Sequence, residues 1–283
     1  MKNIENRSAS PLPDEHLSNE RSTPAHGVGE WAKHTVNWQV GCGNRCRYCF
    51  SSCNSIRFKR TTPTSWGQPV INQKAVAKNY RKLTGRIMVP TSFDIVPGNL
   101  LESLVVLSKL LRAGNELLIV SKPNLACIQA ICADLRDHKE QILFRFTIGS
   151  ADDKILKYWE PGAPSFKERL ASLKWAFEAG FSTSVSCEPM LDKRVDEVVR
   201  ATKPYVTDAI WLGRVNRLRQ TLAINCPGDA EAMRQADQLL AEQTDDYLRE
   251  LYRRYKADPK IKYKDSIKEA AGLERPTEAG LDV

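Results

Sequence analysis

The sequence predicts an α/β fold, a partial TIM barrel of six β/α units followed by a C-terminal helical extension. Short runs of β-branched and apolar residues alternate with longer segments of helical periodicity between residues 34 and 212. Cysteine-bearing and polar segments follow several of the expected strands, at the edge where barrel proteins collect functional side chains. Alternation of this kind requires parallel strands joined by right-handed crossovers.

The expected strands are short and apolar, and helices are expected between them. In chain order they span His34–Val40, Arg86–Val89, Glu116–Ser121, Gln141–Ile148, Phe181–Cys187 and Tyr205–Leu212. Asn99 with Glu102, and Ser165 with Glu168, have the spacing of capping boxes, which predicts that helices begin directly after Asn99 and Ser165.

The C-terminal part predicts one long helix from Asp229 to Asp258, packed on the barrel exterior. The segment Lys260–Lys264 alternates basic with apolar or aromatic residues, and either contacts a polyanion or forms an edge segment. We therefore expect a disordered tail over residues 1–28, the barrel over 29–228, and a C-terminal helix with a basic tail over 229–283.

The chain has 283 residues, of which 42% are hydrophobic, enough for a buried core. No apolar run reaches membrane-spanning length, and the start of the chain lacks the apolar stretch of a secretory signal. We expect a cytoplasmic protein without membrane contact. The eight cysteines fit that compartment, because thiolates that hold a metal group must stay reduced.

The central motif is a group of three cysteines, Cys42, Cys46 and Cys49, within the segment Gly41–Phe50. Three thiolates on a four-iron four-sulfur cluster leave one iron open to an exogenous molecule. Cys53 could instead complete a closed four-thiolate zinc or cluster site. A two-cluster ferredoxin is not expected, because it would need a second cysteine run. A disulfide framework is not expected either, because a chain of this size can bury a core without one.

This cysteine spacing, with the aromatic Tyr48 just before the last cysteine, resembles the radical S-adenosylmethionine enzymes. The resemblance implies that Cys42, Cys46 and Cys49 hold a 4Fe-4S cluster whose open iron binds S-adenosylmethionine. It also implies a reductant of the flavodoxin or ferredoxin type, reductive cleavage to a 5'-deoxyadenosyl radical, hydrogen abstraction from a substrate, and the partial barrel of that superfamily.

Further blocks in the region from Trp38 to Met190 are similar to the spore photoproduct lyase group. They are Thr91–Val96, Val120–Lys122, Phe144–Ser150, Trp159–Phe166 with Arg169–Leu170, and Ala179–Phe181. The similarity implies that Lys122 meets the carboxylate of S-adenosylmethionine and that Thr147 and Ser150, with Tyr48, contact the same cofactor. A lysine is a suitable point-charge partner for a carboxylate.

One departure from that group bears on the reaction. The lyases have a hydrogen-donor cysteine where this chain has Pro90, and proline has no S–H bond. Cys187, at the end of the fifth expected strand, could donate the hydrogen from another side of the active site, or it could be a buried structural cysteine. The strict photoproduct repair reaction is therefore not expected from this chain.

Charged and amide side chains at the other strand ends are candidates for catalysis and substrate binding. Asp94 and Glu188 could orient the substrate or the cofactor, or could cap helices or form salt bridges. Arg214 and Asn216 follow the sixth strand and are expected to bind the substrate, since a guanidinium suits phosphate or carboxylate.

The net charge of +8 is unevenly distributed, because the segment from Gly41 to Phe93 contains no Asp or Glu. It contains ten basic residues, Arg45, Arg47, Arg57, Lys59, Arg60, Lys74, Lys78, Arg81, Lys82 and Arg86. Such a field attracts phosphate, although the segment could equally be a solvated face balanced by acids from elsewhere in the chain. Together with the similarity to the lyase group, it makes a nucleic acid or nucleotide base the favoured substrate. A peptide or small metabolite is the alternative, and a non-enzymatic nucleic-acid-binding module with a four-cysteine zinc site is the second.

Overall fold

The computed structural model describes residues 27–276 and 278–280. Its main element is a sheet of seven parallel strands whose spatial order follows the chain order. The strands are β1 (His34–Thr35), β4 (Ile87–Val89), β5 (Leu117–Ser121), β6 (Ile142–Thr147), β7 (Ser182–Cys187), β8 (Ile210–Leu212) and β9 (Ile261–Tyr263). The expected partial barrel of β/α units is confirmed, with one strand more than predicted.

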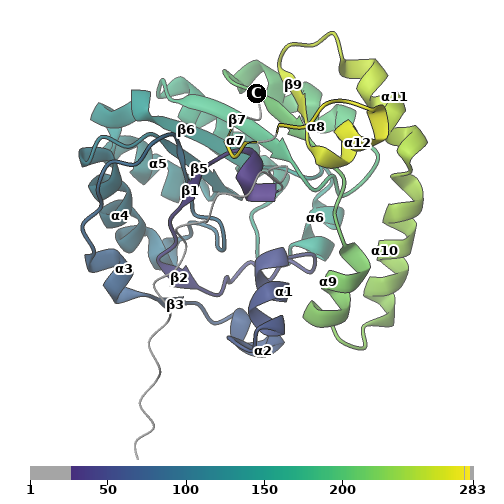
Figure 1. The fold of residues 1–283 in the computed structure, drawn as a ribbon, viewed down its shortest axis with the longest axis horizontal. Helices are drawn as coiled ribbons and strands as arrows, with labels where there is room; N and C mark the ends of the chain where they lie inside the picture. The colour runs from purple at the N-terminus through teal and green to yellow at the C-terminus, as the bar shows by residue number, and fades with distance from the viewer. Residues whose placement is uncertain (1–26, 277, 281–283) are drawn as a thin grey trace, which may run out of the picture.

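Helices surround the curved sheet, as Figure 1 shows. They are α1 (Phe50–Arg57), α2 (Pro63–Trp66), α3 (Gln73–Ala77), α4 (Leu100–Arg112), α5 (Leu125–Asp134), α6 (Asp153–Trp159), α7 (Phe166–Glu178), α8 (Val195–Thr202), α9 (Leu218–Asn225), α10 (Ala230–Glu242), α11 (Asp245–Tyr255) and α12 (Asp265–Ala271). Four short 3₁₀ helices complete the described part, η1 (Gly27–Glu30), η2 (Pro97–Asn99), η3 (Arg136–Gln141) and η4 (Lys203–Tyr205). No helix among the described residues is long and apolar enough to cross a membrane.

The first expected strand is divided into two, which corrects the prediction of a single strand over 34–40. Only β1 joins the main sheet, whereas β2 (Gln39–Val40) pairs antiparallel with β3 (Val70–Ile71). The Asn37 side chain donates to Thr91 Oγ1 at 2.7 Å and accepts from Thr91 N at 2.8 Å. Trp38 is fully buried and meets the Phe93 ring edge-on, 5.1 Å between centroids. These contacts turn the chain out of the sheet before the cysteine segment.

The two predicted capping boxes have different outcomes. Ser165 caps α7, accepting from Glu168 N at 3.2 Å. Helix α4 begins at Leu100 as expected, but Asn99 makes no cap hydrogen bond to it, so the predicted capping box is wrong. Its side chain instead accepts from Val96 N at 2.9 Å and donates to the backbone carbonyl of Asp94 at 3.0 Å. Asn99 therefore shapes the loop that carries Asp94.

The predicted long helix over 229–258 is also wrong, because two helices occupy this region. Gln243 and Thr244 separate α10 from α11. The buried Gln243 side chain donates to Met190 O at 2.9 Å, and Thr244 caps α11 by accepting from Tyr247 N at 3.3 Å. A new helix therefore begins where the sequence pattern predicted one continuous helix.

The segment after α11 supplies the last strand of the sheet. Ile261–Tyr263 forms β9, which pairs with β8, so the edge-segment alternative is confirmed for Lys260–Lys264. This strand lies beyond the 29–228 range expected for the barrel. Of the expected tail over residues 1–28, positions 1–26 lie outside the described residues, while Gly27 and Val28 belong to η1.

A buried ion pair joins the segments next to the two edge strands. Lys264 directly follows β9, and its Nζ lies 2.7 Å from Glu30 Oε1, shortly before β1. The same ammonium donates to Gly27 O at 3.1 Å and lies 4.0 Å from the centroid of the Trp31 ring. Both charged side chains are almost fully buried, so each charge depends on the other for compensation.

Lys264→Met is expected to lower the free energy of unfolding by about 3–5 kcal/mol, because it leaves the Glu30 carboxylate buried without its cation. Glu30→Gln combined with Lys264→Met is the control, since it removes both charges and is expected to cost less than the single change. Urea unfolding followed by circular dichroism measures both values. A loss below about 1 kcal/mol in the single variant would contradict this account.

Candidate functional site

The cysteine loop, residues 41–49, connects β2 to α1. Cys49 is the N-cap of α1, and its Sγ accepts from Ser52 N at 3.4 Å. Cys42 and Cys46 are buried, and Cys49 is half-buried. Gly41 begins the loop with a φ of +88°, and a Cβ there would lie 2.7 Å from Trp66 O. Glycine therefore permits both the backbone conformation and the close packing at the start of the loop.

The three thiols suit a metal group by their chemistry. Burial raises the pKa of Cys42 to about 12, with a further contribution from the Asp94 carboxylate, and burial also raises the pKa of Cys46 and Cys49. A metal group must therefore displace a proton from each thiol. Sulfur donors select iron–sulfur clusters or zinc over magnesium or calcium.

No three His, Cys, Asp or Glu side chains of the described chain converge on a position for one metal ion. A four-iron cluster places each thiolate on a separate iron, so it does not require such convergence. Cys53, the candidate fourth ligand, is buried in α1, with its backbone N–H donating to Cys49 O at 3.0 Å. Cys42, Cys46 and Cys49 thus lie together in one loop, whereas Cys53 lies within α1.

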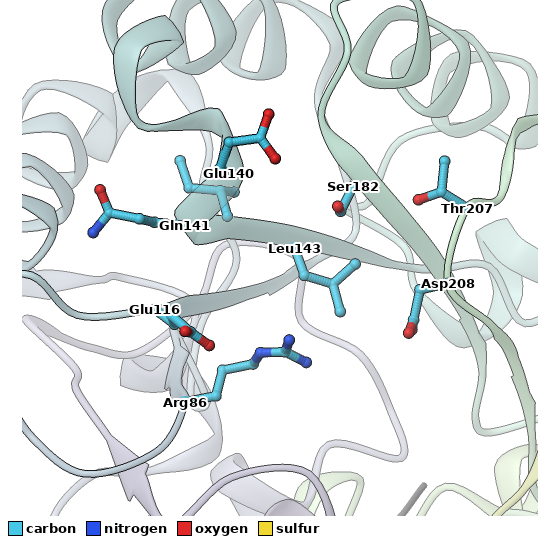
Figure 2. A pocket seen from close by; sticks show the side chains of 9 residues that line it. Arg86, Glu116, Glu140, Gln141, Leu143, Ser182, Thr207 and Asp208 are labelled. Carbon is cyan, nitrogen blue, oxygen red and sulfur yellow. The ribbon is translucent and has the colours of Figure 1, made fainter.

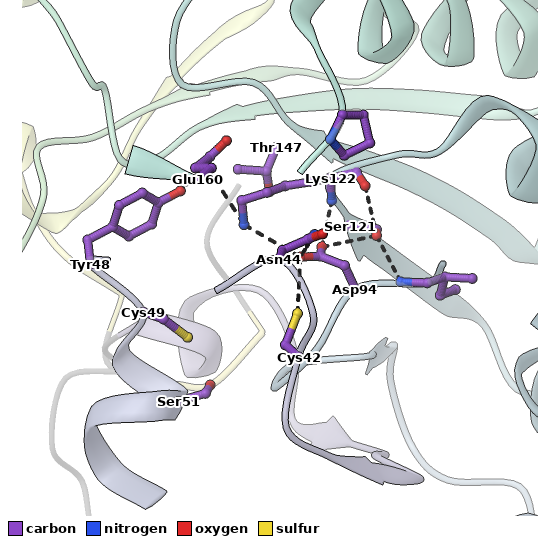
Figure 3. A network of polar contacts seen from close by, with 12 residues as sticks. Cys42, Asn44, Tyr48, Cys49, Ser51, Asp94, Ser121, Lys122, Thr147 and Glu160 are labelled. Atoms are coloured by element: carbon purple, nitrogen blue, oxygen red, sulfur yellow. Dashed lines mark hydrogen bonds and ion pairs between the residues drawn. The ribbon is translucent and has the colours of Figure 1, made fainter. Parts of the chain in front are cut away.

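Asp94 lies beside the cysteine loop and accepts hydrogen bonds from two chain segments, the end of β5 and the cysteine loop (Figure 3). It accepts from Lys122 N at 2.6 Å, from Ser121 Oγ at 3.0 Å and from Asn44 Nδ2 at 2.8 Å. The Cys42 thiol is 3.9 Å from the same carboxylate. Burial alone would raise the pKa of Asp94, but Lys122 and these donors hold that pKa below its usual value. The carboxylate is therefore ionised.

Lys122, directly after β5, extends its ammonium between two carboxylates (Figure 3). Its Nζ lies 3.7 Å from Asp94 Oδ2, 4.0 Å from Glu160 Oε1 and 5.8 Å from the centroid of the Tyr48 ring. Burial opposes its charge, yet the neighbouring carboxylates keep its pKa well above the usual value. Its side chain is only 12% exposed, so Lys122 is not an ordinary surface lysine.

Glu160 is a member of this site that the sequence did not reveal as one. It is buried, accepts from the Tyr48 hydroxyl and pairs with Arg169, which is fully buried in α7. Burial and the Glu160 charge raise the pKa of Tyr48 well above its usual value. The only sequence signal was the position of Glu160 in the Trp159–Phe166 block, which indicated similarity but assigned no role.

Residues 159–162 pack directly on the cysteine loop. Arg47 N donates to Trp159 O at 2.9 Å, and Gly162 N donates to Asn44 O at 3.0 Å. A Cβ at Gly162 would lie 2.4 Å from Gly43 O, so only glycine allows the two backbones to approach this closely. The segment that carries Glu160 thus also supports the loop that carries the thiols.

Helix α9 supports the other side of the cysteine loop, and its role was not predicted. Asn225 Nδ2 donates to the carbonyls of Arg47 and Cys49, each at 2.9 Å. The Arg47 guanidinium pairs with Asp229 at 2.7 Å and lies 4.8 Å from the centroid of the Tyr158 ring. The contacts of Asn225 and Asp229 join residues more than 170 positions apart in the chain, so local patterns carry no signal for them.

The other predicted cofactor residues lie after β6. Thr147 is buried, and its carbonyl accepts from Arg169 Nη1 at 3.2 Å, next to the Glu160 pair. Ser150 is also buried, donates to Asp192 at 2.5 Å and accepts from Asp152 N at 2.9 Å. Thr147 is thus connected to the Lys122 and Glu160 network, whereas the Ser150 hydroxyl bonds to other protein groups.

Cys187 and Glu188, at the end of β7, have different surroundings. Cys187 is fully buried within the main hydrophobic core, and burial raises its pKa. The Glu188 carboxylate lies 3.7 Å from Lys264 Nζ and its side chain is 22% exposed. Burial raises the pKa of Glu188 and Lys264 opposes that rise. Their catalytic roles remain predictions, and Lys264 is the neighbour that sequence reasoning did not assign to Glu188.

The predicted substrate residues after β8 are not brought together with this network by any recorded contact. Arg214 donates to Gln243 O at 3.2 Å and to Asp245 Oδ1 at 3.0 Å, so its guanidinium is directed to the junction of α10 and α11. Asn216 is exposed. Substrate binding by either residue stays a prediction.

The basic segment keeps most of its charge uncompensated. Of its ten basic side chains, Arg47 alone has a carboxylate within 4.0 Å among the residues that the structure covers. No acidic side chain in the described ranges is therefore in ion-pair contact with the other nine, as an ordinary solvated face balanced by acids would require. A nucleic-acid partner stays a prediction.

A cavity of about 270 Å³ lies at the opposite end of the sheet from Lys122. Figure 2 shows the side chains that line it. Its polar lining includes Arg86, Glu116, Gln141 and Asp208, which stand just before strands β4, β5, β6 and β8. Parallel β/α folds place their chemistry at the carboxyl ends of the strands. The candidate site is therefore the network around Lys122 rather than this cavity.

Comparisons with known proteins agree with the geometry. No family model matches the chain. The uncharacterized protein ORF301 of the Acidianus two-tailed virus is 25% identical over 58% of this chain, and the chain spans 58% of that relative's length. A spore photoproduct lyase complexed with dinucleoside spore photoproduct aligns with a TM-score of 0.52 and 16% identity, over 82% of this chain and 76% of the lyase.

A second solved structure, Streptococcus suis SuiB bound to S-adenosylmethionine, aligns with a TM-score of 0.50 and 11% identity, over 88% of this chain and 54% of SuiB. The chain therefore shares the fold of spore photoproduct lyase and SuiB. At these identities the likeness establishes the architecture, and the expectation of a partial barrel of that type is confirmed.

Gly162→Ala is expected to lower the free energy of unfolding by about 1–3 kcal/mol, because the new methyl group forces apart residues 159–162 and the cysteine loop. Gly98→Ala is the matched control, since a Cβ at Gly98 would have no heavy atom within 4 Å. Chemical denaturation measures both variants. Equal stability of the two would show that the segments do not depend on their close approach.

Proposed function

We propose that this protein is a radical S-adenosylmethionine enzyme that binds a 4Fe-4S cluster through Cys42, Cys46 and Cys49. The observation that carries the proposal is the position of the buried Lys122 ammonium, between Asp94 and Glu160 and next to the cysteine loop. A buried cation beside three thiols provides a place for an anionic group close to a soft-metal site. The structural likeness to SuiB bound to S-adenosylmethionine supports the same cofactor.

In this superfamily the cluster and S-adenosylmethionine together supply a 5'-deoxyadenosyl radical that abstracts hydrogen from the substrate. The residues of this chain would bind S-adenosylmethionine and orient it. Lys122 would receive the methionine carboxylate, and the ionised Asp94 offers an acceptor for the methionine ammonium. Glu160 and Tyr48 would hold the Lys122 ammonium in place from the opposite side.

The proposed substrate is a nucleic acid or a nucleotide base. The basic segment that contains the cysteine loop supports it, because nine of its ten cations have no ion-pair partner among the described residues. The similarity to a lyase complexed with a dinucleoside also supports it. Pro90 is buried directly after β4, at the position where the lyases have a donor cysteine. Because proline cannot donate a hydrogen atom, the proposed reaction on the base includes base modification as well as bond cleavage.

Replacing Cys42, Cys46 or Cys49 by Ala is expected to abolish cluster assembly, because each removes one of three thiolate ligands. Cys53→Ala is the control and is expected to keep the cluster. Anaerobic reconstitution followed by iron and sulfide analysis tests the cluster, and chromatography of 5'-deoxyadenosine after addition of dithionite and S-adenosylmethionine tests the reaction. Bound zinc and equal damage by Cys53→Ala would instead support the zinc-module alternative.

Lys122→Met is expected to weaken binding of S-adenosylmethionine to the reconstituted protein by roughly 10- to 150-fold, the range for losing a hydrogen bond to a charged group. Lys122→Arg keeps the positive charge and is expected to retain part of the affinity. Equilibrium dialysis with labelled S-adenosylmethionine measures the dissociation constants. Unchanged affinity in Lys122→Met would remove the assigned role of this residue.

A further inference from the structure

The solvent-facing side of α1 carries two exposed aromatic rings. Phe50 and Phe58 are 58% and 59% exposed, although both are large apolar side chains. Arg57, one residue before Phe58, is also exposed. Positions 50, 57 and 58 lie on one side of a helix, because residues at i, i+7 and i+8 share a face. Aromatic and basic groups therefore alternate along one surface, which we call the α1 strip (Phe50, Arg57, Phe58 and Arg60).

Two guanidinium groups gather at the outer end of the α1 strip. The Cζ atoms of Arg57 and Arg60 lie 5.5 and 5.6 Å from the centroid of the Phe58 ring, within cation–π range. Neither has an ion pair with a carboxylate in the described part of the chain. No acidic residue occurs within the surrounding sequence from Gly41 to Phe93. The positive charge of the strip is thus available to an anionic partner.

The α1 strip extends outward from the cysteine loop. Cys49 caps α1 and Phe50 is its first residue, so the strip begins next to a proposed cluster ligand. Phe58 lies nine residues after Cys49, which corresponds to roughly 14 Å along a helix. A partner bound along the strip would therefore pass from the outer surface to the neighbourhood of the candidate site.

We propose that the α1 strip binds a single-stranded nucleic acid, with bases stacked on Phe58 and Phe50 and phosphates paired with Arg57 and Arg60. The proposal rests on the proposed function and specifies how its substrate is held. Aromatic faces and guanidinium planes are the groups on which unstacked bases lie, and a basic surface follows the backbone. A duplex buries its base faces internally and would use only the charges of the strip.

The test measures binding of fluorescein-labelled dT12 to the full-length, cluster-reconstituted protein by fluorescence anisotropy. Phe58→Ala is expected to weaken binding by roughly 5- to 150-fold, the range for loss of one stacked base. Phe58→Trp is expected to retain the affinity, and Phe58→Leu to lose it, because leucine keeps apolar area without an aromatic face. Leu101→Ala, at a 76% exposed apolar position on α4, is the control and is expected to bind like the parent protein.

The charges are tested through the salt dependence of the same binding. Arg57→Gln with Arg60→Gln is expected to reduce the slope of log affinity against log salt by about 1.4, which corresponds to two phosphate contacts on a single strand. The control removes two other exposed arginines, Arg112→Gln with Arg136→Gln, on α4 and η3. An unlabelled U12 competitor distinguishes RNA from DNA, and a dT12·dA12 duplex reports binding by charge alone.

Three results would overturn the proposal. They are unchanged dT12 binding in Phe58→Ala, equal affinity in Phe58→Leu and Phe58→Trp, and stronger binding of duplex than of single strands. Loss of flavodoxin binding in Phe58→Ala together with intact dT12 binding would assign the strip to an acidic reductant instead. Whether the parent protein forms 5'-deoxyadenosine is a separate measurement, so failure of the proposed chemistry is distinguishable from failure of the strip.

Discussion

The candidate site depends on one buried cation placed between two buried carboxylates. Lys122 lies between Asp94 and Glu160, so its charge stabilises groups from the loop after β4 and from the segment after α6. Removing any member would leave uncompensated charge in a region of low dielectric, which is costly. The interaction therefore fixes the relative positions of three chain segments, and the cysteine loop contacts two of them through Asn44.

Much of the sheet could be predicted because its strands are continuous apolar runs. Leu117–Ser121 and Ile142–Thr147 are buried on both sides, which is the pattern of central parallel strands. The split of the first strand could not be predicted in the same way. It depends on Asn37 and Thr91, which are 54 positions apart, and no local pattern records such a contact. The break between α10 and α11 likewise depends on Gln243 reaching Met190.

The site was predictable where residue type states the chemistry and unpredictable where a side chain supports its neighbours. Three closely spaced cysteines predict a soft-metal site from residue type alone, and that assignment stays a proposal. Glu160 and Asn225 are ordinary residue types, and only their three-dimensional positions reveal that they hold Tyr48 and the cysteine loop. The false capping box at Asn99 shows the same limit. Its spacing from Glu102 predicts a helix cap, but in the fold its side chain bonds to the backbone of the Asp94 loop instead.

The support of the cysteine loop by α9 also affects the order of events during synthesis. Arg47 pairs with Asp229, a residue made 182 positions later. At 5–20 residues per second the ribosome takes roughly 10 to 40 s to cover that interval. During this interval the cysteine loop of the nascent chain lacks the contacts of Asn225 and Asp229. The three thiols thus gain this support only after the C-terminal part of the chain has been made.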